Sequence, residues 1–337
     1  KYLFNYADIK GPPEKRQVEN ISPYLMDAPN IFVNKRRQQI CNEIEMQKGS
    51  QPTDGGNLLL NAEEKEALIA SEPLAVNYIR PFIGAEEFIK GKQRWCLWFD
   101  NVPDTRRNHD LKQMPQVAER IRAVKEMRLA STKAATQKQA DTPYLFTEIR
   151  QVKTKQYLVI PEVSSETRLF IPIGFVSERV IASNKLYTLN SETPLYHFGI
   201  LCSTMHNAFM RIVSGRLESR YQYSAGVVYN NFSFPFTKKE REKPDSSVKK
   251  HLQAIEKAAQ QILDARAHYT AEARAEGLPE PSLADLYRAD AGYTRLDKAH
   301  AALDKAVDAA YGYKGKNDDA QRVAFLFDLY EKALNGL

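Results

Sequence analysis

The stretch LYHFGILCSTMHNAFMRIVSGRLESRYQYSAGVVYNNFSFP, residues 195–235, joins two patterns. Its first half is apolar, follows Thr193 and Pro194, and ends at Gly215. This pattern predicts one helix that is capped by Thr193, has Pro194 in its first turn and is terminated by Gly215. Over 217–230, apolar or aromatic residues alternate with polar ones, which is typical of a strand with one packed and one polar face. The stretch therefore predicts a helix followed by a strand.

Further elements of both kinds lie on either side of this stretch. Residues 61–72 predict a helix capped by Asn61 with Glu64 three positions on, and 115–131 predict a second helix. Strands are predicted at 94–99 and between 144 and 189, where β-branched and aromatic residues are frequent. We expect a mixed α/β (α+β) fold, rich in strands with inserted helices.

The C-terminal part has a different composition. Residues 237–247 are charged and contain proline, which is typical of a linker. Three Ala-rich amphipathic segments follow, and Leu296, Leu303 and Val307 give one of them an apolar stripe. We expect a small all-α region after the linker.

Charge is unevenly distributed along the 337 residues. The formal net charge is +6, yet residues 101–180 carry 14 Lys/Arg against 9 Asp/Glu and 181–243 carry 8 against 4, while both ends are slightly acidic. A basic middle suggests a polyanionic partner such as nucleic acid or a membrane surface, although a solvated charged face is the commoner reading of any one cluster.

Cysteines and chain ends bear on the cellular compartment. Cys41, Cys96 and Cys202 have neither disulfide-framework nor zinc-site spacing, which favours a reducing cytoplasm. No apolar run is long enough to span a bilayer. We expect no membrane among the partners. The start, KYLFNYADIK, lacks an initiator Met and a signal-peptide layout, so we expect the chain to begin inside a longer protein.

Motifs for catalysis are weak. The chain has no glycine-rich nucleotide loop and no nucleophile elbow, and TDGGN (53–57) is better explained by a tight turn. His197 and His206 share an apolar helix, where satisfied core histidines are commoner than a metal pair. Asp54, Glu63 and Lys65 imitate a nuclease motif, but the last two fall in a charged helix start. No catalytic residue and no metal site are predicted.

Several long motifs, taken together, resemble one family. They are YADIKG (6–11), ISPYL (21–25), DGGNLLL (54–60), RPFIGAEEFIKGKQRWCLW (80–98), YLVIPEVSSETRLFIPIGF (157–175), LYHFGILCSTMHNAFMRIVSGRLESRYQYSAGVVYNNFSFP (195–235) and LDKAHAALDKAVDAAYG (296–312). In this order they resemble the C-terminal half of the bacterial adenine-specific DNA methyltransferases of the MmeI-like group. These are type IIL (or IIG) restriction-modification enzymes with nuclease, methyltransferase and target recognition domains in one polypeptide.

The resemblance implies a domain layout and a function. Residues 1–17 would end a linker from a methyltransferase domain outside this chain, 18–236 would be the DNA target recognition domain, and 237–337 a C-terminal helical domain. The chain itself would hold no cofactor. The parent enzyme would use S-adenosylmethionine to methylate adenine N6, and Mg²⁺ if it carries a nuclease domain. The implied partners are double-stranded DNA and the methyltransferase domain of the same polypeptide.

Sequence-specific DNA binding needs cations for phosphates and forked polar side chains for base edges. Arg220 could bridge guanine O6 and N7, and Gln222 could bridge adenine N6 and N7. The base-reading candidates are Arg168, Arg220, Gln222, Ser224, Ala225 and Gly226. The phosphate-contact candidates are Arg128, Thr132, Lys133, Gln137, Lys138, Lys185, Arg211 and Arg216.

Plainer roles compete with these assignments. Tyr221, Tyr223 and Tyr229 fall on the packed face of the predicted strand and favour core packing over base stacking. Arg211 and Arg216 flank a helix C-terminus, where cations are favoured without a ligand. Asn230 and Asn231 could simply hydrogen-bond a turn.

Two other functions remain open at this stage. One is the specificity part of a nuclease-free phage-defence methyltransferase, and the other is a structural or protein-interaction domain with an incidental basic surface.

Overall fold

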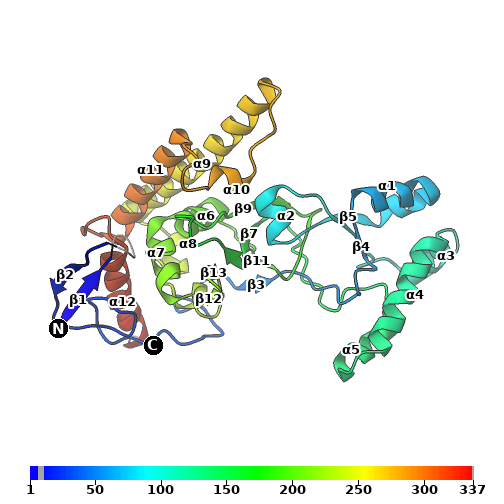
Figure 1. The fold of residues 1–337 in the computed structure, drawn as a ribbon, viewed down its shortest axis with the longest axis horizontal. Helices are drawn as coiled ribbons and strands as arrows, with labels where there is room; N and C mark the ends of the chain where they lie inside the picture. Colours follow the sequence, from blue (N-terminus) through cyan, green and yellow to red (C-terminus); the bar gives the residue numbers. More distant parts are fainter. Residues whose placement is uncertain (7–10, 336–337) are drawn as a thin grey trace. The chain divides into compact units, whose positions relative to one another are not determined.

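The computed structural model describes residues 1–6 and 11–335, which divide into two compact units (Figure 1). Unit 1 consists of Lys1–Met46, Glu162–Ile173 and Ser191–Leu337. Unit 2 consists of Gln47–Pro161 and Gly174–Asn190. Each unit therefore combines segments far apart in the sequence.

Unit 2 contains two four-stranded sheets and five helices. The first sheet has the order β10 (Ile181–Ala182), β5 (Ile79–Ile83), β6 (Trp95–Leu97), β4 (Leu59–Leu60). The second has the order β3 (Met46–Lys48), β11 (Leu186–Leu189), β7 (Gln156–Pro161), β9 (Gly174–Ser177). The helices are α1 (Ala62–Ser71), α2 (Ala85–Lys90), α3 (Asp104–Leu111), α4 (Pro115–Leu129) and α5 (Ala134–Lys138).

The predicted helix starts in unit 2 are confirmed. The Asn61 side chain accepts a hydrogen bond from Glu64 N, and the Glu64 side chain accepts one from Asn61 N. Together these bonds satisfy two backbone donors at the start of α1 that have no partner within the helix. In α4, Val117, Ile121 and Val124 are buried in a core cluster that also holds residues of β4, β5 and β6. This apolar stripe fixes which side of α4 faces solvent.

Unit 1 corrects the helix predicted over 194–215. Two helices occupy this stretch, α6 (Pro194–Cys202) and α7 (Thr204–Val213). Ser203, between them, has an extended backbone; its hydroxyl donates to Ile200 O (2.7 Å) and accepts from His206 N (3.4 Å). This single serine closes one helix and caps the next, so the axis breaks there.

The strand predicted over 217–230 is also shorter than expected. A hairpin of β12 (Gly215–Leu217) and β13 (Arg220–Gln222) is followed by turns and a short 3₁₀ segment, Tyr229–Asn231. The alternation of exposed and buried side chains nevertheless holds from 220 to 225. Tyr221, Tyr223 and Tyr229 are buried, which confirms the core-packing interpretation.

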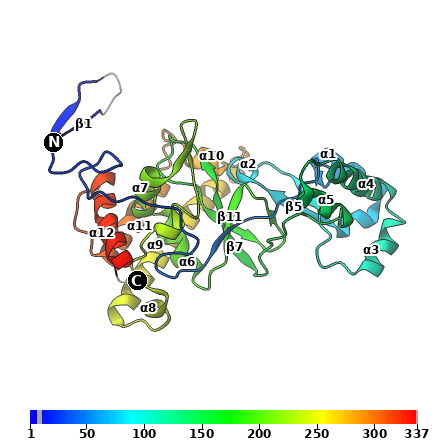
Figure 2. The same cartoon turned by 90° about the horizontal axis from the view of Figure 1, so that it is seen from below.

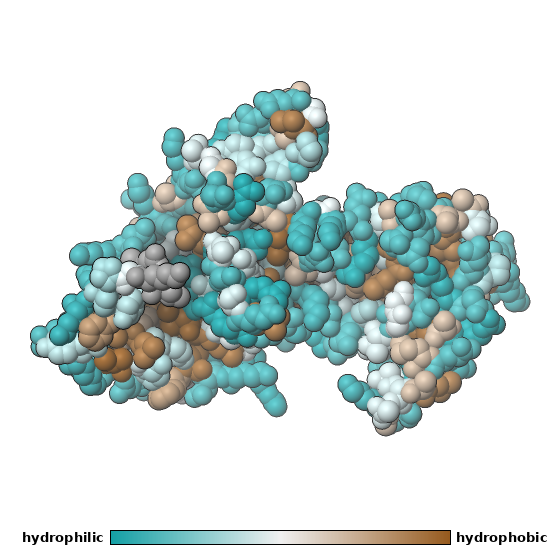
Figure 3. Space-filling view, viewed as in Figure 1, coloured by the Kyte–Doolittle hydropathy of each residue, from teal (hydrophilic) through white to brown (hydrophobic). Residues whose placement is uncertain are grey.

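The C-terminal helices of unit 1 are α8 (Lys238–Glu242), α9 (Ser246–Ala275), α10 (Leu283–Leu286), α11 (Thr294–Tyr311) and α12 (Asp319–Asn335) (Figures 1 and 2). Helix α11 packs along α9 with Leu296, Leu303 and Val307 buried, as the stripe predicted. Hydrophilic side chains predominate on the face of this helix pair drawn in Figure 3. A hairpin of β1 (Tyr2–Asn5) and β2 (Glu14–Gln17) completes unit 1. The expected mixed fold with C-terminal helices is confirmed.

The stretch interpreted as a solvated linker contains a buried contact. Thr237 and Glu240 form a capping box that starts α8. On this helix, Arg241 makes an ion pair with Glu43 that is almost completely buried, and His197 Nε2 lies 3.1 Å from the same carboxylate. These hydrogen bonds and charges hold the pKa of Glu43 below its usual value despite burial. The segment therefore anchors the C-terminal helices rather than merely connecting them.

Candidate nucleic-acid interface

A three-stranded sheet in unit 1 carries the main base-reading candidates. Strand β13 pairs with β12 on one side and with β8 (Val163–Ser164) on the other, all antiparallel. Arg220 is exposed and Gln222 half-buried, while Tyr221 between them is buried. Because neighbouring strand residues face opposite sides, Arg220 and Gln222 share the outer face.

Arg220 is held loosely. Its Nη2 lies 2.7 Å from Glu218 Oε2, and both side chains are well exposed. Glu218 adopts a left-handed backbone (φ 58) in the two-residue turn of the hairpin. An exposed pair of this kind contributes at most about 1 kcal/mol, so a ligand can displace Glu218 from the guanidinium.

The loop after β8 lies at the turn end of the hairpin. Tyr221 pairs with Ser164, so the residues that follow Ser164 run beside the turn. The pKa of Glu166 in this loop is lowered, chiefly by a hydrogen bond from its own backbone. A hydrogen bond from Ser219 and the charge of Arg216 lower it further. The structure therefore brings the loop of Arg168 beside the strand of Arg220.

Arg168 itself is half-buried, and burial lowers its pKa. Its Nε is buried without a hydrogen-bond partner among the described residues. The rest of the guanidinium is the part through which Arg168 could meet a ligand.

Arg216 on β12 is exposed but partly organised by its neighbours. Its guanidinium carbon lies 3.8 Å from the centre of the Tyr221 ring, and Nη1 donates to Ser219 O (3.1 Å). Stacking on the tyrosine fixes the plane of the guanidinium while one edge stays in solvent. Arg216 is thus a preorganised cation beside the hairpin.

The structure does not place 224–226 at the tip of a strand. Ser224 O accepts from Val228 N (2.7 Å), Ala225 is buried, and a Cβ on Gly226 would lie 3.0 Å from Lys35 Cγ. These residues form a packed turn. Ala225 and Gly226 therefore have packing roles instead of base-reading roles, and only Ser224 keeps a partly exposed polar side chain.

Most of the other phosphate-contact candidates belong to unit 2. Thr132, Lys133, Gln137 and Lys138 are exposed around the start and end of α5. Gln137 Nε2 donates to Ser131 O (2.8 Å), which ties this short helix to the end of α4. Lys185 is exposed in the turn before β11.

Arg128 was wrongly expected to contact phosphate. Its side chain is fully buried, and all five of its N–H donors are directed at backbone carbonyls. The acceptors are Pro52, Thr53, Gln139, Thr142 and Leu145, at 2.8–3.1 Å. Burial lowers its pKa, and nearby Asp54 opposes that shift. Arg128 is a structural residue that ties two loops to α4.

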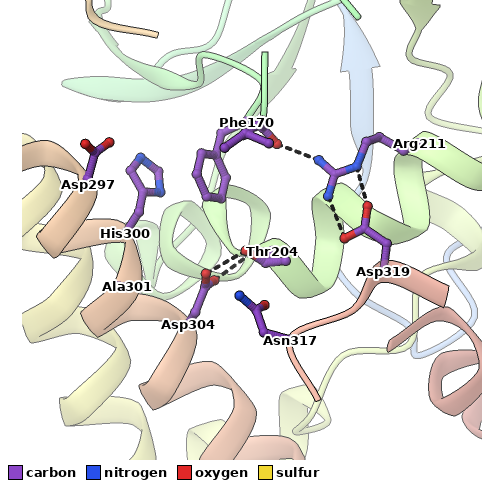
Figure 4. A pocket seen from close by; sticks show the side chains of 10 residues that line it. Phe170, Thr204, Arg211, Asp297, His300, Ala301, Asp304, Asn317 and Asp319 are labelled. Carbon is purple, nitrogen blue, oxygen red and sulfur yellow. Dashed lines mark hydrogen bonds and ion pairs between the residues drawn. The ribbon is translucent and has the colours of Figure 1, made fainter. Parts of the chain in front are cut away.

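Arg211 is also a structural residue. It makes a two-pronged ion pair with Asp319 (2.7 and 2.9 Å), as Figure 4 shows. It also donates a hydrogen bond to Leu169 O. The surrounding hollow of about 420 Å³ is lined by further acidic side chains, Asp297 and Asp304. Such a lining repels phosphate.

Sequence reasoning placed the histidines correctly in the core. His197 and His206 are buried; His206 Nδ1 lies 3.0 Å from Leu201 O and its Nε2 lies 3.1 Å from Tyr223 Oη. Across the residues that the structure describes, no three metal-ligating side chains gather in a cluster. No helix in that part of the chain is long and apolar enough to cross a membrane.

Comparisons with known proteins identify the family. Residues 27–236 match the family model of the MmeI target recognition domain, and residues 247–337 match that of the MmeI C-terminal domain. The first match covers well over half of the chain and defines its class, a target recognition domain. The chain belongs to the MmeI family, which confirms the resemblance seen in the motifs.

Two relatives cover nearly the whole chain. The solved structure of the type IIL restriction-modification enzyme MmeI in complex with DNA has a TM-score of 0.86 and 44% identity, over 99% of this chain and 41% of that one. DNA methyltransferase A of Bacillus subtilis (strain 168) is 36% identical over 332 residues, 98% of this chain and 34% of that protein. The chain thus spans well under half of either relative.

Proposed function

We propose that this chain selects a short sequence in double-stranded DNA for a larger restriction-modification enzyme. The observation that carries the proposal is the outer face of β13, where Arg220 and Gln222 project beside the loop of Arg168 from a sheet backed by buried tyrosines. The solved MmeI relative, bound to DNA, supports the choice of ligand.

Arg220 and Gln222 have the chemistry that reading of base edges requires. The guanidinium presents two parallel donors that match guanine O6 and N7, and the Gln222 amide matches adenine N6 and N7. Each such pair contributes about 1–3 kcal/mol of discrimination against a wrong base. Arg168 and Ser224 are the remaining base-reading candidates, and the buried Tyr221 and Tyr223 hold the strand in place for all of them.

Exposed basic and polar side chains are the candidates for contacts with the phosphates of the DNA backbone. Arg216 projects from the neighbouring strand β12 on the face of Tyr221, opposite to the face of Arg220 and Gln222. The candidates of unit 2 are the cations Lys133, Lys138 and Lys185 and the polar Thr132 and Gln137. Contacts of this kind position a protein on the duplex without reading sequence.

The whole protein would act on the site that this chain selects. We propose that 18–236 is the recognition domain, that 237–337 is a helical domain, and that 1–17 lead from a methyltransferase domain. That domain would take the target adenine out of the stack and transfer a methyl group from S-adenosylmethionine to its amino nitrogen. The relative named DNA methyltransferase A supports the methyltransferase part. A nuclease domain would add a need for Mg²⁺, and its absence would make the protein a modification enzyme alone.

Binding to duplex DNA at several salt concentrations tests the proposal. We expect the complete protein to prefer one short sequence and to lose affinity steeply as salt rises, because phosphate contacts release counterions. The Arg220→Ala variant should lose preference at one base pair, and Lys133→Ala should weaken binding to all sequences alike. Weak binding that is insensitive to both salt and sequence would instead favour a protein-interaction domain.

A further inference from the structure

A basic segment, Lys35–Arg36–Arg37, is fastened to the turn that follows β13. Two buried asparagines of that turn donate to backbone carbonyls of the segment: Asn230 Nδ2 to Arg36 O (2.9 Å) and Arg37 O (3.1 Å), and Asn231 Nδ2 to Asn34 O (2.9 Å). These bonds join residues almost 200 positions apart in the sequence, so they set the position of the segment in the folded chain.

Backbone hydrogen bonds and a close approach complete this attachment. Arg36 N donates to Gly226 O (2.8 Å) and Ile40 N to Asn230 O (2.8 Å). The Lys35 stem lies across Gly226, where an added Cβ would come within 3.0 Å of Lys35 Cγ and 3.2 Å of Arg36 O. Glycine is the residue that leaves room for the lysine here.

The three cations of this segment differ in their surroundings. Arg36 is half-buried and interacts with Tyr330 of α12, whereas Lys35 and Arg37 are exposed. In the described part of the chain, no carboxylate pairs with Lys35 or Arg37. The hydrogen bonds hold the backbone from which Lys35 and Arg37 project, so both cations stay near the turn without a carboxylate partner.

We propose that Lys35 and Arg37 bind backbone phosphates of the DNA close to the bases that strand β13 reads. Gly226, Asn230 and Asn231 position these two cations. This inference rests on the proposed function. The attachment points lie within 226–231, in the turn and the 3₁₀ segment that follow β13, so the cations are tied to the chain just after the strand of the base-reading candidates. The segment has no helix or strand that could enter a groove, which favours phosphates over base edges.

The salt dependence of binding measures these contacts. The complete protein is compared with Lys35→Ala/Arg37→Ala and with a control, Lys249→Ala/Lys250→Ala, which removes the same charge from exposed positions of α9. Each phosphate contact contributes about 0.9 to the slope of log K against log salt, so the test variant should lose about 1.8. Between 50 and 200 mM salt its affinity should then fall about tenfold less than that of the wild type.

A second variant separates positioning from reading. Gly226→Ala pushes on Lys35 and Arg36, so it should weaken binding to all sequences alike. If Gly226→Ala changed the preference at one base pair, the positioning role would be overturned. If Lys35→Ala/Arg37→Ala had the same slope of log K against log salt as the control variant, the phosphate contacts would be overturned. If selective binding by the wild type persists in either case, the proposed function survives; if the wild type itself shows no selective, salt-dependent binding, both fail.

Discussion

Replacing Arg128 by methionine tests whether the structure assigns this cation correctly. The substitution keeps an unbranched apolar side chain in the buried site and removes all five donors. The carbonyls that lose a partner belong to residues 52–53 and 139–145, two loops on either side of α4. We therefore expect a loss of stability that is centred on these loops of unit 2.

The size of the loss follows from the environment. Removing one partner of a buried charged network costs about 3–5 kcal/mol, because polar groups are left without hydrogen bonds. Arg128→Lys restores at most three of the five donors, so it should recover only part of this loss. The matched control is Arg122→Met on the exposed face of α4, which should change stability by less than about 0.5 kcal/mol.

Hydrogen exchange read peptide by peptide is the suitable assay. A loss of 3–5 kcal/mol corresponds to a fall in protection on the order of 10² to 10⁴. That fall should appear in peptides covering 52–58 and 139–147. The structural role of Arg128 would be refuted if Arg128→Met showed the same hydrogen exchange as the wild type. The variant would also have to reduce the slope of log K against log salt for DNA binding by about 0.9, the contribution of one phosphate contact.

The other predictions concern the stability of the two units. Burial lowers the pKa of His206 and His300 to about 3, so between that value and about 6.5 only the unfolded chain takes up these protons. The free energy of unfolding should thus fall with decreasing pH over this range, by roughly 1.4 kcal/mol per pH unit and histidine, and urea titrations of His206→Asn should show a shallower fall. Gly199→Ala should destabilise unit 1 by about 1–3 kcal/mol, since its Cβ would lie 2.8 Å from Ile255 Cγ2; unchanged thermal unfolding would contradict the α6–α9 packing. Asn61→Ala should cost unit 2 about 1 kcal/mol through loss of the cap, visible as faster exchange in α1.

Local signals predicted the elements whose ends are decided within a few residues. The capping box of α1 and the spacing of Val117, Ile121 and Val124 in α4 needed no tertiary information. The same spacing, continued by four residues, reaches Arg128 and places it on the buried side of the helix. The spacing alone does not predict this burial, because an arginine is rarely fully buried.

Other features depend on contacts that no local pattern carries. Ser203 breaks a continuous apolar run, and its hydroxyl could equally have bonded back within one helix. The burial of Arg241 depends on Glu43, 198 positions away, although the capping box of Thr237 and Glu240 was a readable sign of α8. The attachment of 34–37 to 226–231 is likewise invisible before the chain is folded. Sequence alone therefore predicts a strand with Arg220 and Gln222 on one face, although the strand is shorter than expected, and it does not predict the segment attached beside it.

The most direct test of the central claim is the base-resolved preference of the complete protein. Random duplexes are selected by the wild type and by the Arg220→Ala and Gln222→Ala variants, and the bound sequences are read. The wild type should select one short motif, and each variant should lose preference at one base pair while keeping the others. A wild type without a motif, or variants that keep the full motif and merely bind more weakly, would contradict sequence reading by β13.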